Sequence, residues 1–230
     1  MTITANLLTR WAGLAAAAAG AIFIGVQINH PQLNAITIQT TEIGVRDTFK
    51  VLMAALALAG ITGMYLNQIR KHGVLGLIGY VVFAVGYLGI MCVTFAAAYV
   101  LPEVASSSTG FVNDAIAANT ARGPVKGDIG TFGPVLKVLG FAYMVGSLLF
   151  GIALYRARVL PRWASALLAV AGLATAVLAL TPDAVYRFLA FPNGIAMIAL
   201  GYSLWQVARN DTTPESQAVD TPAPRTASLA

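Results

Sequence analysis

The chain has 230 residues, of which 58% are hydrophobic and only 10% are charged. Soluble domains carry about 25% charged residues, so this composition argues against a soluble globular domain and favours a membrane protein. The formal net charge is +5, but the basic residues are separated by long apolar runs, so no nucleic-acid-binding patch is predicted. With the single cysteine Cys92, no intramolecular disulfide can form.

Six apolar runs predict six transmembrane helices. Each run is long enough, or nearly so, to cross a hydrocarbon core of about 30 Å, and none alternates like a barrel strand. Backbone hydrogen bonds must be satisfied inside lipid, so helices are the remaining solution. The sequence therefore predicts an all-α, polytopic transmembrane bundle of six helices, forming one domain over residues 1–209. In chain order the expected helices span about residues 11–28, 49–66, 74–101, 132–154, 163–180 and 185–207.

The first apolar run has an alternative interpretation. Arg10 followed by the apolar segment 14–26 also fits a secretory signal peptide. A clean cleavage site with small residues does not follow, because residues 27–32 are mostly polar and include Pro31. We therefore expect a retained helix, and a cleaved signal peptide remains the alternative.

Two segments outside the apolar runs have their own composition. Residues 102–131 form a predicted outer loop, with a weakly helical stretch at 111–121 followed by Gly-Pro and Gly-Asp turns. A loop this long is either functional or merely tolerated, and both interpretations stay open. Residues 210–230 are rich in Thr, Pro, Ala and Ser and predict a disordered cytoplasmic tail.

The charges predict an orientation in the bilayer. The short connections 67–73 and 156–162 are basic, whereas the other side of the six-helix arrangement as a whole carries six basic and six acidic residues. Basic residues in short loops mark the cytoplasmic side, so both termini are expected in the cytoplasm and the chain in the cell (plasma) membrane. Trp11, Trp163 and Trp205 fall near the same predicted interface, where indole rings are favoured.

The sequence predicts no metal and no other cofactor. Its two histidines, His30 and His72, fall on opposite sides of a bilayer about 30 Å thick, so they cannot ligate one haem together. The chain also lacks a cysteine cluster and zinc-ligand spacing. Ser147 has no base at the same depth, which favours a hydrogen bond within the bundle over nucleophilic catalysis.

Charged residues near the predicted outer boundary are the main candidates for a site. Glu42, Arg46 and Lys50 recur at intervals of four residues and therefore share one helix face, with Asp47 beside them. A charge at this depth is costly unless it is paired, hydrated or snorkelling. Two interpretations stay open: a solvated rim with internal ion pairs, or a polar vestibule that receives a ligand.

Lys137 is the basic residue that the sequence places deepest in the bundle. We expect it to face the interior and to lie close to a carboxylate of Glu42, Asp47, Glu103 or Asp183, because an unpaired charge would be poorly solvated there. Stripes on the third and fourth helices could continue a vestibule inward. The predicted ligand-binding residues are Glu42, Arg46, Asp47, Lys50, Tyr87, Glu103, Lys137 and Ser147.

Three short motifs carry a resemblance. They are His30-Pro31 after the first helix, the stretch 60–65 before a basic turn, and the segment 158–164 that opens the fifth helix. In these motifs the chain resembles a loosely defined group of small bacterial multipass membrane proteins without an assigned function. The resemblance implies the membrane architecture and assigns no catalytic or ligand residue.

The favoured function is non-enzymatic. We expect the chain to bind or pass a small or lipid-like molecule, or to support a membrane-protein partner or a second copy of itself, with the lipid bilayer as its surroundings and no nucleic acid. The alternative is a membrane-embedded enzyme with an outward-facing charged site. The middle of the predicted helices carries no carboxylate, and ion-coupled transporters commonly use one, so active transport is disfavoured.

Overall fold

The structure is a computed structural model, and it describes residues 3–178 and 190–210. Over these residues the chain is all-α, with eight α-helices, one short 3-10 helix and no strand. The predicted all-α class is therefore confirmed for this part of the chain. The elements are α1 (Ala5–Gly25), η1 (Thr37–Gln39), α2 (Thr41–Asn67), α3 (Ile69–Tyr99), α4 (Leu101–Ala105), α5 (Thr109–Thr120), α6 (Phe132–Ala157), α7 (Arg162–Leu178) and α9 (Phe191–Asn210).

Among the described residues, four helices are long and apolar enough to cross a membrane, namely α1, α2, α3 and α6. Helix α7 is a shorter apolar helix of 17 residues, and α9 has 20 residues. Many large apolar side chains on these helices are exposed, among them Leu88, Phe141 and Val170. This distribution is expected where lipid rather than water covers the outer surface.

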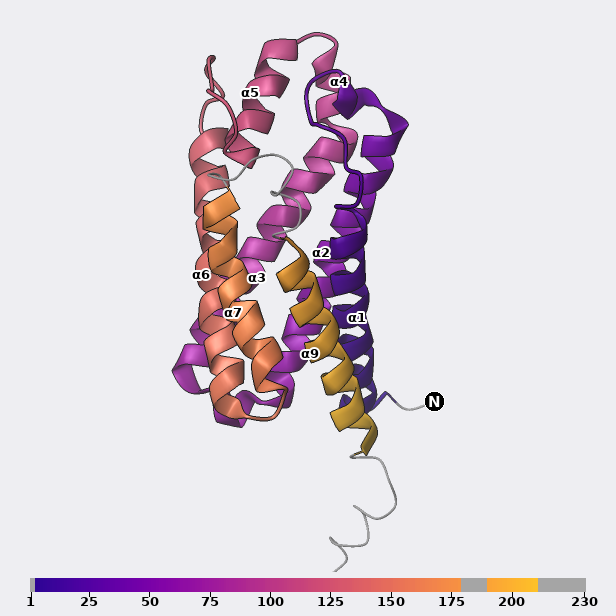
Figure 1. Cartoon of the computed structure of the whole chain (residues 1–230), viewed down its shortest axis with the longest axis vertical. Helices are drawn as coiled ribbons and strands as arrows, with labels where there is room; N and C mark the ends of the chain where they lie inside the picture. Colours follow the sequence, from indigo (N-terminus) through magenta and orange to yellow (C-terminus); the bar gives the residue numbers. More distant parts are fainter. Residues whose placement is uncertain (1–2, 179–189, 211–230) are drawn as a thin grey trace, which may run out of the picture.

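The six longest helices form a closed ring in chain order. Each of them packs against the next one along the chain, and α9 returns to pack against α1. The helices run alternately up and down, so α1 begins and α9 ends at the same end of the bundle (Figure 1). That end also carries the tight turns between α2 and α3 and between α6 and α7, and we call it the turn end. The opposite end carries residues 26–40, α4 and α5, and we call it the loop end.

Glycines let the helices approach closely at two joints of the ring, between α1 and α9 and between α3 and α6. Gly13 and Gly20 of α1 face the backbone of α9, and Gly86 of α3 faces the backbone of Tyr143 in α6, leaving no room for a Cβ atom. Membrane helices gain much of their association energy from such close packing, because lipid provides no hydrophobic drive between them. Helix α1 packs against both α2 and α9, which supports its prediction as a retained part of the bundle.

The predicted outer loop is a folded cap at the loop end. Ile38, Ile43 and Val112 lie in a second apolar cluster that joins η1, α2, α4 and α5. Asp114 of α5 accepts hydrogen bonds from the backbone N–H groups of Lys126 and Gly127 at 2.9 and 2.8 Å, which fixes the segment after α5. The polar composition of residues 102–131 did not indicate this folded structure, which is held by hydrogen bonds from backbone N–H groups and by a small apolar core.

Several predicted helix boundaries are shifted. Helix α1 begins at Ala5, where the Thr4 hydroxyl accepts from the N–H of Leu7 at 3.2 Å, and α2 begins at Thr41 rather than near residue 49. The start of α3 precedes a break at Gly73, whose φ of 56° and ψ of −160° suit glycine. The predicted end of the fifth helix, the start of the sixth and the tail lie outside the described residues.

Candidate functional site

A cavity of about 300 Å³ lies inside the ring, in the half nearer the loop end. All six helices of the ring contribute to its wall, and Asn119 of α5 reaches it from the cap. Most lining side chains are apolar, such as Phe23, Met53 and Leu136. A mostly apolar pocket with a few placed polar groups is the usual form of a small-molecule site.

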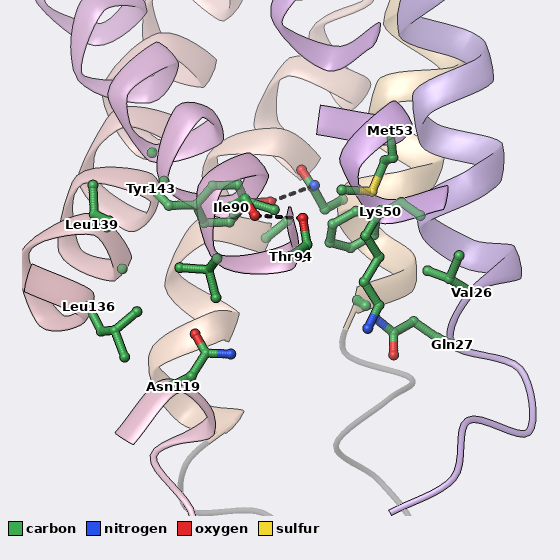
Figure 2. Close-up of a pocket in the computed structure, with 18 residues that line it drawn as sticks. Val26, Gln27, Lys50, Met53, Ile90, Thr94, Asn119, Leu136, Leu139 and Tyr143 are labelled. Atoms are coloured by element: carbon green, nitrogen blue, oxygen red, sulfur yellow. Dashed lines mark hydrogen bonds between the residues drawn. The ribbon is translucent and has the colours of Figure 1, made fainter. Parts of the chain in front are cut away.

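The polar lining residues fall in two tiers (Figure 2). Gln27, Lys50 and Asn119 lie near the loops, and Thr94 and Tyr143 lie further into the bundle. Thr94 satisfies its own hydroxyl by donating to the carbonyl of Ile90 at 2.8 Å. Its only hydroxyl hydrogen is used in this bond, so a donor for a ligand is to be sought at the other polar residues.

The tier near the loops contains a charged cluster of Asp47, Lys50 and His30. Lys50 Nζ donates to Asp47 Oδ1 at 2.6 Å and lies 3.0 Å from His30 Nε2. An ammonium can only donate, so Nε2 must accept and the proton of a neutral imidazole is on Nδ1. His30 Nδ1 lies 2.8 Å from the carbonyl oxygen of Pro31, which can only accept. Both contacts thus require the same neutral tautomer.

This charged cluster is buried and formally neutral. The side chain of Asp47 is 2% exposed and that of Lys50 is 16% exposed. Asp47 Oδ2 is buried with no hydrogen-bond partner among the described residues. Two of the three ammonium hydrogens of Lys50 are used by Asp47 and His30. One donor of Lys50 therefore remains at the cavity wall for a ligand acceptor.

The deeper tier joins α3, α6 and α9. Asn193 Nδ2 donates to the hydroxyl oxygen of Tyr143 at 2.7 Å, and both residues are buried. The Tyr87 ring meets the Tyr143 ring edge-on, with centroids 5.4 Å apart. Asn193 Oδ1 is buried without a partner among the described residues. A buried amide oxygen with no donor is costly, so this tier also has capacity for a ligand or water.

The structure brings three of the predicted site residues to the cavity or its immediate support. Lys50 lines the cavity, Asp47 pairs with Lys50, and Tyr87 supports Tyr143. Lys50 lies on α2 and Tyr87 on α3, two helices that pack against each other.

Arg46, Glu42 and Ser147 have structural roles. Arg46 pairs with exposed Glu42 at 2.9 Å and donates to the carbonyls of Val26 and Ile28 at 3.2 and 2.9 Å. These carbonyls follow the end of α1, where helical acceptors lack partners, so Arg46 caps α1. Ser147 donates to the carbonyl of Leu168 at 2.7 Å and joins α6 to α7, as expected for a hydrogen bond within the bundle.

Glu103 and Lys137 do not join the cluster. Both are exposed, and neither forms an ion pair with another residue of the described ranges. The expected pairing of Lys137 with Glu42, Asp47 or Glu103 does not occur, and Asp183 lies outside the described residues. The long lysine side chain keeps its charge at the surface, which removes the need for a buried partner.

Sequence reasoning missed the neutral members of the site. His30 was considered as a haem ligand and as part of the His30-Pro31 motif, and Tyr143 and Asn193 were not singled out. Asn193 carried a usable signal, because an amide in an apolar helix needs a partner inside the bundle. Among the described residues no group of three metal-ligating side chains occurs, and His30 and His72 lie at opposite ends of the bundle.

The comparisons with known proteins give no information about the site, so its function is inferred from its own residues. A comparison of the chain with protein-family models, with curated proteins and with solved structures found no match.

Proposed function

We propose that this chain is a six-span membrane protein that binds a small molecule in the ring cavity without chemical conversion. The observation that carries the proposal is the cavity itself, with apolar walls from all six ring helices and hydrogen-bonding groups left over at Lys50 and Asn193. A molecule with an apolar body and a polar group matches both features.

The ring supports the proposal of six spans. Helices α7 and α9 are short, but they complete the ring between α6 and α1 and run alternately with the other four. Arg70, Lys71, Arg156, Arg158 and Arg162 all lie at the turn end. The positive-inside rule makes this end cytoplasmic, with both termini inside and the loop end outside the cell membrane.

The orientation is tested by labelling intact cells with a membrane-impermeant thiol reagent. Single cysteines are introduced at Ser107 in the cap and at Asn210 at the end of α9, in a Cys92→Ser background. We expect labelling at Ser107→Cys only, because three helices of the ring separate the two positions. Labelling only at Asn210→Cys would reverse the orientation, and labelling at both would require an even number of spans between them.

Binding is favoured over passage because the cavity does not continue to the turn end. Phe83, Tyr87 and Phe150 are 0–1% exposed and fill the middle of the ring. Beyond them lie further large side chains of the main apolar cluster, including Met64, Leu154 and Leu204. Protein cores packed in this way leave few voids, so the inner end of the cavity is closed and a bound molecule would not pass on to the turn end.

The chemistry of the molecule follows from the unused groups. The cluster of Asp47, Lys50 and neutral His30 has no net charge, so no counterion is needed in the cavity. Lys50 has one hydrogen left to donate, and a carbonyl or hydroxyl oxygen would accept it. A volume of about 300 Å³ holds about ten groups of the size of water. The ligand is therefore small, or only part of it enters.

Native mass spectrometry of the detergent-purified protein tests this proposal. We expect a discrete mass adduct on the parent chain that is lost in Val93→Trp, because Val93 lines the cavity and an indole would fill it. The matched control is Val85→Trp on the same helix, where the valine is exposed on the outer surface. An adduct that persists in Val93→Trp, or is lost equally in both variants, would contradict binding in the cavity.

A further inference from the structure

The cavity reaches the outer surface of the bundle at Gly140. This glycine lines the cavity and is itself exposed, and a Cβ atom added to it would meet nothing within 4 Å. Its neighbours Val138 and Phe141 are 65% and 63% exposed and lie on the outer side of α6. The cavity therefore has a lateral opening on a surface that the six-span arrangement turns toward lipid.

The depth of this opening places it in the outer leaflet. Helix α6 begins at Phe132 at the loop end, and Gly140 lies eight positions further along the helix. At about 1.5 Å per residue, the opening lies about 12 Å along the helix, within half of a hydrocarbon core about 30 Å thick. Exposed Lys137 lies one turn nearer the loop end on the same side, where a lysine can extend its ammonium to the headgroups.

The interior of the cavity runs from this opening to Lys50. Leu136, Gly140 and Tyr143 recur on one face of α6 and form the wall nearest the opening, whereas Lys50 lies on α2 across the ring. Between them the wall is mainly apolar. A molecule that spans this distance would meet a hydrogen-bond donor at one end and lipid at the other.

Resting on the proposed function, we propose that the cavity takes a single-chain amphiphile from the outer leaflet, with an uncharged hydroxyl or carbonyl head at Lys50 and its alkyl chain leaving past Gly140. The free hydrogen of Lys50 supplies the recognition of the head. The opening at Gly140 lets the chain exceed the cavity volume, because its remainder stays in lipid. The absence of a side chain at Gly140 is then what keeps the path open.

Tryptophan quenching by a brominated amphiphile tests this proposal. The reporter is Phe23→Trp in the full chain in nanodiscs, because Phe23 lines the cavity and the exchange is conservative. The native Trp11, Trp163 and Trp205 lie toward the turn end, and the parent's signal is subtracted. The probes carry bromine near the head: 2-bromo-1-decanol, 1-bromodecane without a hydroxyl, and 2-bromoethanol without a chain.

We expect saturable quenching by 2-bromo-1-decanol at a concentration at least about tenfold lower than by either other probe, a difference of about 1.4 kcal/mol. Gly140→Phe should weaken this quenching by about tenfold or more. Val138→Phe should leave it unchanged, because Val138 is 65% exposed on the outer side of the same helix. Gly140→Leu is a second variant that should block the opening, for use if Gly140→Phe does not fold.

The outcomes separate this proposal from the proposed function. If Gly140→Phe and Gly140→Leu both leave the saturable quenching unchanged, the lateral path past Gly140 is wrong. If 2-bromoethanol binds with equal affinity, the ligand does not need an alkyl chain. If no probe quenches saturably but the adduct of the parent is still lost in Val93→Trp, the amphiphile class is wrong and the binding function stands. If the adduct does not depend on the cavity either, both proposals fail.

Discussion

Lys50→Met is expected to lower the free energy of unfolding by about 3 kcal/mol, because it leaves a buried carboxylate without its cation. Asp47 is 2% exposed, and its Oδ2 has no partner among the described residues even in the intact pair. The loss of Lys50 would leave Oδ1 unpaired as well. The measurement is reversible unfolding of the detergent-solubilised protein, followed by circular dichroism.

The double variant Asp47→Asn/Lys50→Met identifies the cause of that loss. Neutralising both members removes the unpaired charge, so we expect the double variant to be more stable than Lys50→Met alone. Glu42→Gln is the control, because the Glu42 side chain is 55% exposed and exposed pairs contribute only about 0–1 kcal/mol. If Lys50→Met leaves the free energy of unfolding unchanged, or if the double variant is no more stable than Lys50→Met, the ion pair of Asp47 and Lys50 does not stabilise the buried cluster.

Gly146→Ala is the second change with a large expected effect. A Cβ atom there would overlap the backbone of Phe83 on α3, which cannot move aside like the end of a side chain. We expect a loss of about 1–3 kcal/mol, the usual cost of overpacking. Parting α3 from α6 would also disturb Tyr87 and Tyr143, which meet across the same joint at the deeper tier of the cavity.

Gly140→Ala is the matched control on the same helix. Nothing lies within 4 Å of its added Cβ atom, and alanine favours a helix interior over glycine by about 0.5–1 kcal/mol. The same chemical change should thus stabilise α6 at residue 140 and destabilise the bundle at residue 146. Equal effects in thermal unfolding would contradict the close packing of α3 on α6.

The helical architecture was predictable because it depends on local composition. Long apolar runs such as 132–154 leave few alternatives to a helix in lipid, and α6 begins at the predicted residue. The start of α2 was harder to place, because its first turns carry Glu42, Arg46 and Asp47. Their cost is offset by contacts outside the helix, including the carbonyls after α1 that Arg46 binds.

The candidate site was only partly predictable. Asp47 was predicted beside the stripe of Glu42, Arg46 and Lys50 and as one candidate partner of Lys137, whereas in the structure it pairs with Lys50 at 2.6 Å. The contact of Asn193 with Tyr143 joins residues 50 apart in the chain. The spacing of residues within one helix does not predict a contact between two helices that lie so far apart in the sequence. Lys137 was expected inside because of its depth in the sequence, but rotation about the helix axis places it on the exposed side.

The most direct test is a density map of the full chain in lipid nanodiscs, prepared without removing co-purified molecules. The account predicts density for a bound molecule inside the ring, with a polar atom about 3 Å from Lys50 Nζ, while Lys50 stays paired with Asp47. A ring closed by its own side chains at the level of Met53 and Tyr143, with Lys50 turned to the bulk solvent, would contradict the account.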